Sequence, residues 1–178
     1  MPPQTLWTIG HSNRSLAALV ELLRREEIAL VADVRRFPAS RAHPQFNRED
    51  LEPGLAEQGI GYRHFVALGG RRNKRMPGSA NTAWRVQAFN AFADYMQTPE
   101  FAASLDELMA AAQTGRTAIM CAEALPWQCH RRLIADALVA LGWTVLDIMG
   151  SGQPKPHALP PFARFEGEQV TYPGEALF

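Results

Sequence analysis

Apolar and polar positions form two different patterns along the chain, and these patterns predict strands and helices in alternation. Short, nearly continuous apolar runs are typical of strands covered on both faces, whereas apolar residues three and four positions apart are typical of amphipathic helices. The predicted strands cover residues 6–9, 28–34, 61–68, 117–121 and 144–149. The predicted helices cover residues 16–27, 47–58, 99–114 and 126–141, with a further helical region around residues 89–96.

The alternation of strands and helices predicts a single three-layer α/β domain over residues 1–178. Such a domain has a mostly parallel sheet, here of about five strands, with helices on both faces. Ser15 and Thr98 are the predicted N-caps of two helices, and Pro126 is the predicted first residue of another. Residues 69–82 show no periodicity and predict a long basic loop. Residues 150–178 predict a Pro/Gly-rich tail with a short hairpin.

Composition narrows the class of protein. The 178 residues are 47% hydrophobic and 20% charged, which is ordinary for a globular domain and excludes a disordered, collagen-like or coiled-coil chain. No apolar run approaches the length of a membrane span, and the first residues do not resemble a signal peptide. We therefore expect a cytoplasmic protein with no membrane partner, in which Cys121 and Cys129 are reduced.

The zero net charge hides a basic segment. Residues 35–85 contain ten Lys and Arg but four Asp and Glu, and the rest of the chain has the opposite excess. A basic segment of this kind favours contact with an anion such as a phosphate, a nucleotide or a nucleic-acid backbone. The alternative is a solvated loop without a ligand.

Chemically active residue types follow each predicted strand. Because the carboxyl ends of parallel strands meet at one edge of a sheet, we expect these residues to surround one cavity. The candidate catalytic residues are His11, Glu123, Cys129 and His130. The candidate residues for binding an anionic substrate are Ser12, Asp33, Arg35 and Arg131. In this hypothesis the arginines hold the anion, and a histidine oriented by a carboxylate moves protons.

Three of these residues break a local rule. Asp33 interrupts an apolar strand, where a carboxylate is costly unless it is paired, so it either orients a ligand or forms an ion pair with Arg35 or Arg131. His130 and Arg131 lie in the early turns of a predicted helix, where cations oppose the helix dipole. A bound anion would compensate for them, and so would pairing with Glu123 or Asp33.

The cysteines and the missing motifs leave the chemistry open. Cys129 is either a nucleophile with a lowered pKa or a buried core residue, and Cys121 is expected in the core. The spacing of Cys121, Cys129, His130 and His11 does not match a zinc site, so no metal is expected. No nucleotide-binding motif occurs, and Trp127 stands where a cysteine phosphatase loop needs an arginine. The cofactor, if any, is unknown.

Several short motifs together resemble the bacterial family named domain of unknown function 488. These motifs are Thr8 to Asn13, Asp33 to Arg35 with Pro38 and Ser40, Leu68 to Gly70, and Met120 to Glu123 followed by Cys129 to Arg131. The resemblance implies a single α/β domain and no settled activity. Ala124 to Trp127 is more apolar than the family pattern, which would narrow the pocket.

Three functional hypotheses follow. The first is a pocket for a small anionic or phosphate-bearing ligand, in a hydrolase or transferase. The second is a nucleic-acid module, in which the basic loop contacts phosphates and an aromatic residue stacks on bases. The residues of this second hypothesis are Arg71, Arg72, Lys74, Arg75, Trp84 and Arg85. The third is a polar cluster with a purely structural role.

Overall fold

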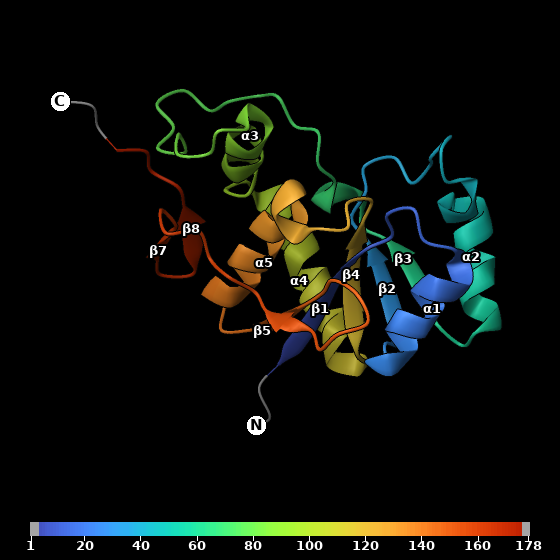
Figure 1. Ribbon diagram of the computed structural model, residues 1–178. Coiled ribbons are helices and arrows are strands. Elements are labelled where there is room, and N and C mark those ends of the chain that lie inside the picture. The colour runs from blue at the N-terminus through green and yellow to red at the C-terminus, as the bar shows by residue number, and fades with distance from the viewer. Residues whose placement is uncertain (1–3, 176–178) are drawn as a thin grey trace.

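The sheet of this protein has five parallel strands and one short antiparallel edge strand (Figure 1). The computed structural model describes residues 4–175. The strands are β1 (Thr5–Gly10), β2 (Leu30–Asp33), β3 (Gly61–His64), β4 (Thr117–Cys121), β5 (Thr144–Ile148) and β6 (Lys155–Pro156). Their order in the sheet is β3-β2-β4-β1-β5-β6. The predicted mostly parallel sheet of about five strands is therefore confirmed.

Helices cover both faces of this sheet, which confirms the three-layer arrangement (Figure 1). One face is covered by α1 (Leu16–Arg25) and α2 (Arg48–Glu57), and the other by α3 (Gln87–Tyr95), α4 (Pro99–Thr114) and α5 (Arg131–Ala140). Each face has its own apolar core. Leu19, Leu23 and Leu51 are fully buried in one core, and Leu108 and Leu133 are fully buried in the other.

The strand order creates a crevice between β1 and β4. From β1 the chain crosses to β2, and from β4 it crosses in the opposite direction to β5, although β1 and β4 are neighbours. The connections that follow these two strands consequently cover opposite faces of the sheet. Ligands of open α/β sheets bind at such a switch point, outside the carboxyl ends of the strands.

The predicted helix caps are confirmed. The Ser15 hydroxyl accepts a hydrogen bond from the Ala18 N–H at 3.1 Å, and the Thr98 hydroxyl accepts one from the Phe101 N–H at 3.3 Å. Each cap satisfies an N–H group that has no partner within its own helix. No helix among residues 4–175 is both long enough and apolar enough to cross a bilayer.

Two predicted elements have different limits in the structure. The third strand ends at His64, and Val66–Leu68 forms a 3-10 turn that leaves Val66 largely exposed. The predicted helix from Pro126 is wrong at its start. Pro126–Gln128 is a separate 3-10 turn, Cys129 is extended, and α5 begins at Arg131. Proline suits the first turn of either helix type, so its position did not distinguish the two.

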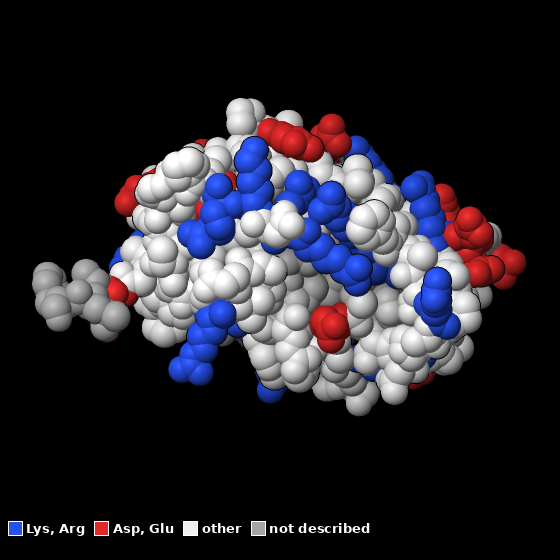
Figure 2. Space-filling view, turned by 90° about the horizontal axis from the view of Figure 1, so that it is seen from above, with Lys and Arg blue, Asp and Glu red and all other residues white. Residues whose placement is uncertain are grey.

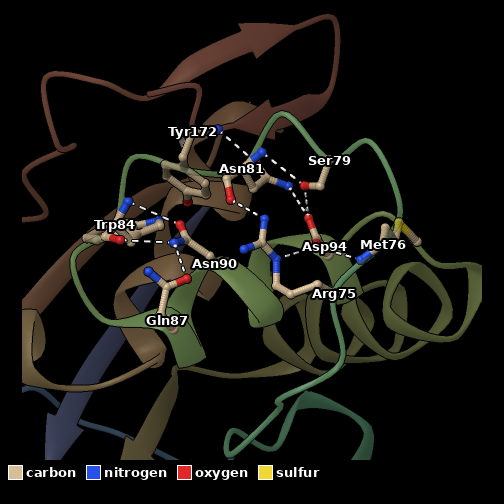
Figure 3. A network of polar contacts seen from close by, with 9 residues as sticks. All are labelled: Arg75, Met76, Ser79, Asn81, Trp84, Gln87, Asn90, Asp94 and Tyr172. Carbon is tan, nitrogen blue, oxygen red and sulfur yellow. Dashed lines mark hydrogen bonds and ion pairs between the residues drawn. The ribbon is translucent and has the colours of Figure 1, made fainter. Parts of the chain in front are cut away.

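The basic loop of residues 69–82 is anchored by a buried carboxylate on α3. Asp94 accepts hydrogen bonds from Arg75 Nε at 2.8 Å, the Met76 N–H at 2.9 Å, Asn81 Nδ2 at 2.9 Å and the Ser79 hydroxyl (Figure 3). These bonds lower the pKa of Asp94 although its burial opposes the shift. The loop is thus held in one arrangement without regular secondary structure.

The C-terminal segment packs against this loop. The predicted hairpin is present as β7 (Arg164–Glu166) and β8 (Gln169–Thr171). The Tyr172 N–H then donates to Asn81 Oδ1 at 2.9 Å, which joins the C-terminal segment to the basic loop (Figure 3).

Replacing Asp94 with alanine is expected to release the loop. Arg75, Ser79 and Asn81 would lose their shared acceptor, and unpaired buried polar groups are destabilising. We expect trypsin to cleave the native protein within residues 71–75 about tenfold faster than the wild type, because cleavage follows local opening. Asp106→Ala removes an exposed carboxylate from α4 and is the matched control. Equal cleavage rates in the two variants would contradict this role of Asp94.

Candidate functional site

A cavity of about 400 Å³ opens at the carboxyl edge of the sheet, beside the ends of β1, β2 and β4. It is lined by five of the eight residues predicted for the anion pocket, namely His11, Arg35, Glu123, Cys129 and His130. Ser12, Asp33 and Arg131 do not line it. The strand ends therefore meet at one cavity, but the side chains divide into those that face it and those that lie behind it.

Asp33 lies behind the cavity and forms an ion pair with Arg35. The two side chains meet at 2.8 Å between Arg35 Nη2 and Asp33 Oδ2. The fully buried carboxylate also accepts a hydrogen bond from the Tyr62 hydroxyl at 2.6 Å. Burial and this carboxylate raise the pKa of Tyr62. The ion-pair alternative therefore describes Asp33, and the proposed contact of Asp33 with a ligand has no support in its geometry.

His11 is a neutral histidine with both ring nitrogens engaged. Its Nδ1 lies 2.9 Å from the Ser12 carbonyl oxygen, which can only accept, so Nδ1 carries the proton. Its Nε2 then accepts from Arg35 Nη1 at 3.4 Å. Burial lowers the pKa of His11 to about 4, and the ring stacks on Phe46 with centroids 4.4 Å apart. This geometry makes His11 a residue that positions Arg35.

His130 is also neutral, with the opposite tautomer. Its Nε2 lies 2.9 Å from the Val34 carbonyl and 3.0 Å from the Leu68 carbonyl, so Nε2 carries the proton. Its Nδ1 is an acceptor 3.5 Å from Cys129 Sγ. Burial lowers the pKa of His130 to about 4. The ring fits because residue 70 is glycine, where a Cβ would lie 2.8 Å from Nδ1.

Arg131 is fully buried behind the cavity wall, in contrast to its predicted role as an anion ligand. Its guanidinium donates to the carbonyls of Glu123 and Ala124, to the Thr8 hydroxyl at 3.3 Å and to Cys121 Sγ at 2.7 Å. Within residues 4–175 it forms no ion pair with a carboxylate. A buried guanidinium without a counter-charge is costly, so the Cys121 sulfur is the group that can supply one as a thiolate.

The two cysteines form a pair at the cavity wall. Burial raises the pKa of Cys121, but the hydrogen bond from Cys129 and the charge of Arg131 outweigh burial and lower this pKa to about 7. Burial and the neighbouring Cys121 raise the pKa of Cys129 well above its ordinary value. Both sulfurs are buried in the core, with Cys121 2% and Cys129 6% exposed, as predicted for Cys121 and as one of the two alternatives for Cys129. The neighbouring Arg131 favours Cys121 over Cys129 as the thiolate, which the sequence did not indicate.

At the predicted anion site, the first three N–H groups of α5 already have partners. Arg131 N–H lies 3.5 Å from Cys129 Sγ, and the N–H groups of Arg132 and Leu133 donate to the carbonyls of Cys129 and His130. Cys129 precedes the helix in an extended conformation and is not in its first turn. The Arg132 guanidinium lies 4.6 Å from the Trp84 ring centroid. The two arginines are therefore accommodated without a bound anion.

The structure divides the residues of the nucleic-acid hypothesis into buried, paired and free side chains. Trp84 is 7% exposed and packs edge-on against Phe89 and Phe162, so the expectation that it stacks on bases is wrong. Arg75 is bound to Asp94, and Arg72 lies over the Tyr95 ring at 3.5 Å. Within the described chain, the side chains of Arg71, Lys74 and Arg85 form no hydrogen bond or ion pair.

Sequence reasoning missed a second buried polar cluster behind the sheet. It consists of His157, Asp136, Asp147, Thr8 and Tyr172. The available signal was the presence of Asp136 and Asp147 at otherwise apolar positions of a helix and a strand. No group of three His, Cys, Asp or Glu side chains among residues 4–175 is arranged to hold a metal ion.

The fold and the cavity define an α/β protein with a doubly wound, mostly parallel sheet and a cavity at the switch point between β1 and β4. The chain belongs to the family described as Domain of unknown function DUF488, whose model matches residues 15–138. The resemblance seen in the sequence motifs is thereby confirmed. Neither the comparison with curated proteins nor the comparison with solved structures gave a match.

Proposed function

We propose that this protein is a cytoplasmic hydrolase or transferase that binds a small anionic or phosphate-bearing substrate and uses Cys121 as its nucleophile. The observation that carries the proposal is the contact between Cys121 Sγ and the buried guanidinium of Arg131. The thiolate is the reactive form of cysteine, and a neighbouring cation favours it near neutral pH. A reducing compartment keeps both cysteines available.

The cavity suits an anionic substrate in size and charge. A volume of about 400 Å³ falls in the range of small-molecule sites. Arg36 and Arg71 line the cavity and are exposed, whereas Arg35 is balanced by Asp33. The Arg36 guanidinium donates to the Arg71 carbonyl at 3.1 Å but has no carboxylate partner among the described residues. Glu123 is the acidic residue in the cavity lining, so the two exposed arginines leave this lining with an excess of positive charge.

The proposed reaction has two steps. The Cys121 sulfur attacks an electrophilic atom of the substrate and forms a bond to it, and the leaving group departs with the electron pair of the broken bond. Water or another acceptor then takes the group from sulfur and regenerates the thiolate. The single S–H of Cys129 donates to Cys121, and the His130 ring packs beside Cys129 with Nδ1 3.5 Å from Cys129 Sγ. These residues position the nucleophile.

Alkylation of the native protein by iodoacetamide tests this proposal. In Cys129→Ser, which keeps a hydroxyl donor toward Cys121, we expect the alkylation rate to titrate with a midpoint near 7. In Cys121→Ser, the matched control, burial still opposes ionisation of Cys129, which should react more slowly than Cys121 does at pH 7. Reaction of Cys121 only after unfolding would leave the structural role of this polar cluster as the better explanation.

Protection by an anion tests the substrate class in the same assay. Millimolar pyrophosphate should slow alkylation of Cys121 because it occupies the mouth of the cavity near Arg36 and Arg71. Arg71→Ala should weaken this protection, whereas Arg25→Ala, at the C-terminal end of α1, should not. Alkylation rates that pyrophosphate leaves unchanged would contradict an anionic substrate.

A further inference from the structure

A second cavity lies under the basic loop and shares one lining residue with the cavity of the proposed site. The second cavity measures about 460 Å³ and is lined by Arg72, Lys74, Arg75 and Tyr95. Arg36 lines both cavities and therefore lies between them. From above, onto the carboxyl ends of the strands, Lys and Arg side chains form a row across the molecule (Figure 2). This edge therefore offers an elongated basic surface.

The cations of this surface divide into anchored and free groups. Arg75 is held by Asp94, and Arg72 is held over Tyr95 and by the Gly69 carbonyl at 3.2 Å. Arg71 and Lys74 are exposed and, within the described residues, have no side-chain partner. The anchored residues keep the loop in place, so the free charges are presented without a large ordering cost on binding.

Two exposed aromatic side chains belong to the segments that follow β2 and β4 at the carboxyl edge of the sheet. Phe37 is 61% exposed and lines the cavity, and Trp127 is 52% exposed and precedes Gln128, which also lines it. Phe37 follows β2 and Trp127 follows β4, and these two strands are paired. Exposed aromatic rings next to a basic groove are the features on which single-stranded nucleic acids bind, through base stacking and phosphate contacts.

We propose that the substrate of the site is a segment of single-stranded nucleic acid. Its phosphates lie along Arg36, Arg71 and Lys74, its bases stack on Phe37 and Trp127, and one nucleotide enters the cavity beside Cys121. A duplex cannot insert a paired base into this cavity, and an acidic peptide would leave the aromatic rings unused. This inference rests on the proposed function because it names the substrate class of that same cavity.

Trp127 provides a direct reporter of binding. The chain has four tryptophans, and Trp7, Trp84 and Trp143 are each at most 7% exposed. Iodide should therefore quench mainly the fluorescence of Trp127. A mixed-sequence single-stranded oligonucleotide should protect this fluorescence from iodide, and Trp127→Phe should abolish the quenchable signal while keeping an aromatic ring for stacking.

The same oligonucleotide, carrying a fluorescent label, allows binding to be followed by fluorescence anisotropy at several salt concentrations. The salt dependence separates phosphate contacts from base stacking. Arg71→Ala/Lys74→Ala should weaken binding at least about tenfold at low salt and reduce the salt slope by about 1.4, since each single-strand phosphate contact contributes about 0.7. Phe37→Ala/Trp127→Ala should weaken binding by about tenfold or more and leave the slope unchanged. Arg24→Ala/Arg25→Ala, at the end of α1 on the opposite edge, should bind like the wild type.

Three results would overturn the inference: no binding at low salt, equal binding of the matching duplex, or equal binding of a polyglutamate of the same charge. The pyrophosphate assay keeps the two proposals distinct. Protection of Cys121 by pyrophosphate without oligonucleotide binding would reject only the nucleic-acid substrate. Oligonucleotide binding to a protein whose Cys121 is unreactive would reject the nucleophile and keep the binding surface.

Discussion

Replacing Gly10 with alanine is expected to destabilise the protein by about 3 kcal/mol or more. A Cβ at this position would lie 1.6 Å from the Glu123 carbonyl oxygen and 2.9 Å from Ala124 Cα. These are backbone atoms, so no side-chain rotation relieves the clash. The segment cannot withdraw easily either, because buried Arg131 donates to the carbonyls of both residues.

Urea denaturation of Gly10→Ala and Gly150→Ala measures this effect against a matched control. A Cβ at Gly150 meets no atom within 4 Å, and that glycine does not need a left-handed backbone, so its replacement should change stability by no more than about 0.5 kcal/mol. If Gly10→Ala were as mild as the control, the segment after β4 would not be held over β1 by Arg131.

The stability of the fold is expected to fall by on the order of 3 kcal/mol between pH 6.5 and about 9 because His157 loses a proton. Its imidazole is 3% exposed and lies 2.6 Å from Asp136 Oδ1 and 3.2 Å from Asp147 Oδ2. Burial opposes protonation, but the hydrogen bonds and charges of the two carboxylates outweigh burial and raise the pKa of His157 to about 9.

The direction follows from the raised pKa. Below the unfolded value of about 6.5 both states bind the proton and the ion pairs contribute fully. Between that value and about 9 the folded state keeps the proton and the unfolded state releases it, so stability declines as the pH rises. Above this range the contribution is lost.

Urea denaturation across this pH range, in a Cys121→Ser/Cys129→Ser background, isolates the histidine from thiol titration. The background is needed because the lowered pKa of Cys121 would make stability rise with pH over part of the same interval. His157→Asn should lower stability by about 3 kcal/mol at pH 6.5 and flatten the pH profile. An unchanged pH profile in His157→Asn would contradict the ion-pair model.

The order of strands and helices and the gathering of polar residues at the carboxyl edge could be predicted from local pattern. Apolar periodicity reflects which face of each element is buried, and it lies within a few residues of chain. The parallel sheet then brings His11, Glu123 and Cys129 together, because all of them follow strands. The N-cap roles of Ser15 and Thr98 could also be predicted from the sequence, since a cap side chain binds an N–H only three residues away.

The difference in pKa between the two cysteines, the position of Arg131 and the burial of Trp84 depended on contacts between distant parts of the chain. Arg131 meets Thr8, which is 123 residues away in sequence, and this contact helps to hold its guanidinium behind the cavity beside Cys121. Burial and neighbouring charge set the pKa of a thiol, and neither is encoded in the residues next to it. The sequence pattern therefore located the carboxyl-edge cavity, and tertiary packing decided which sulfur in its wall has the lowered pKa.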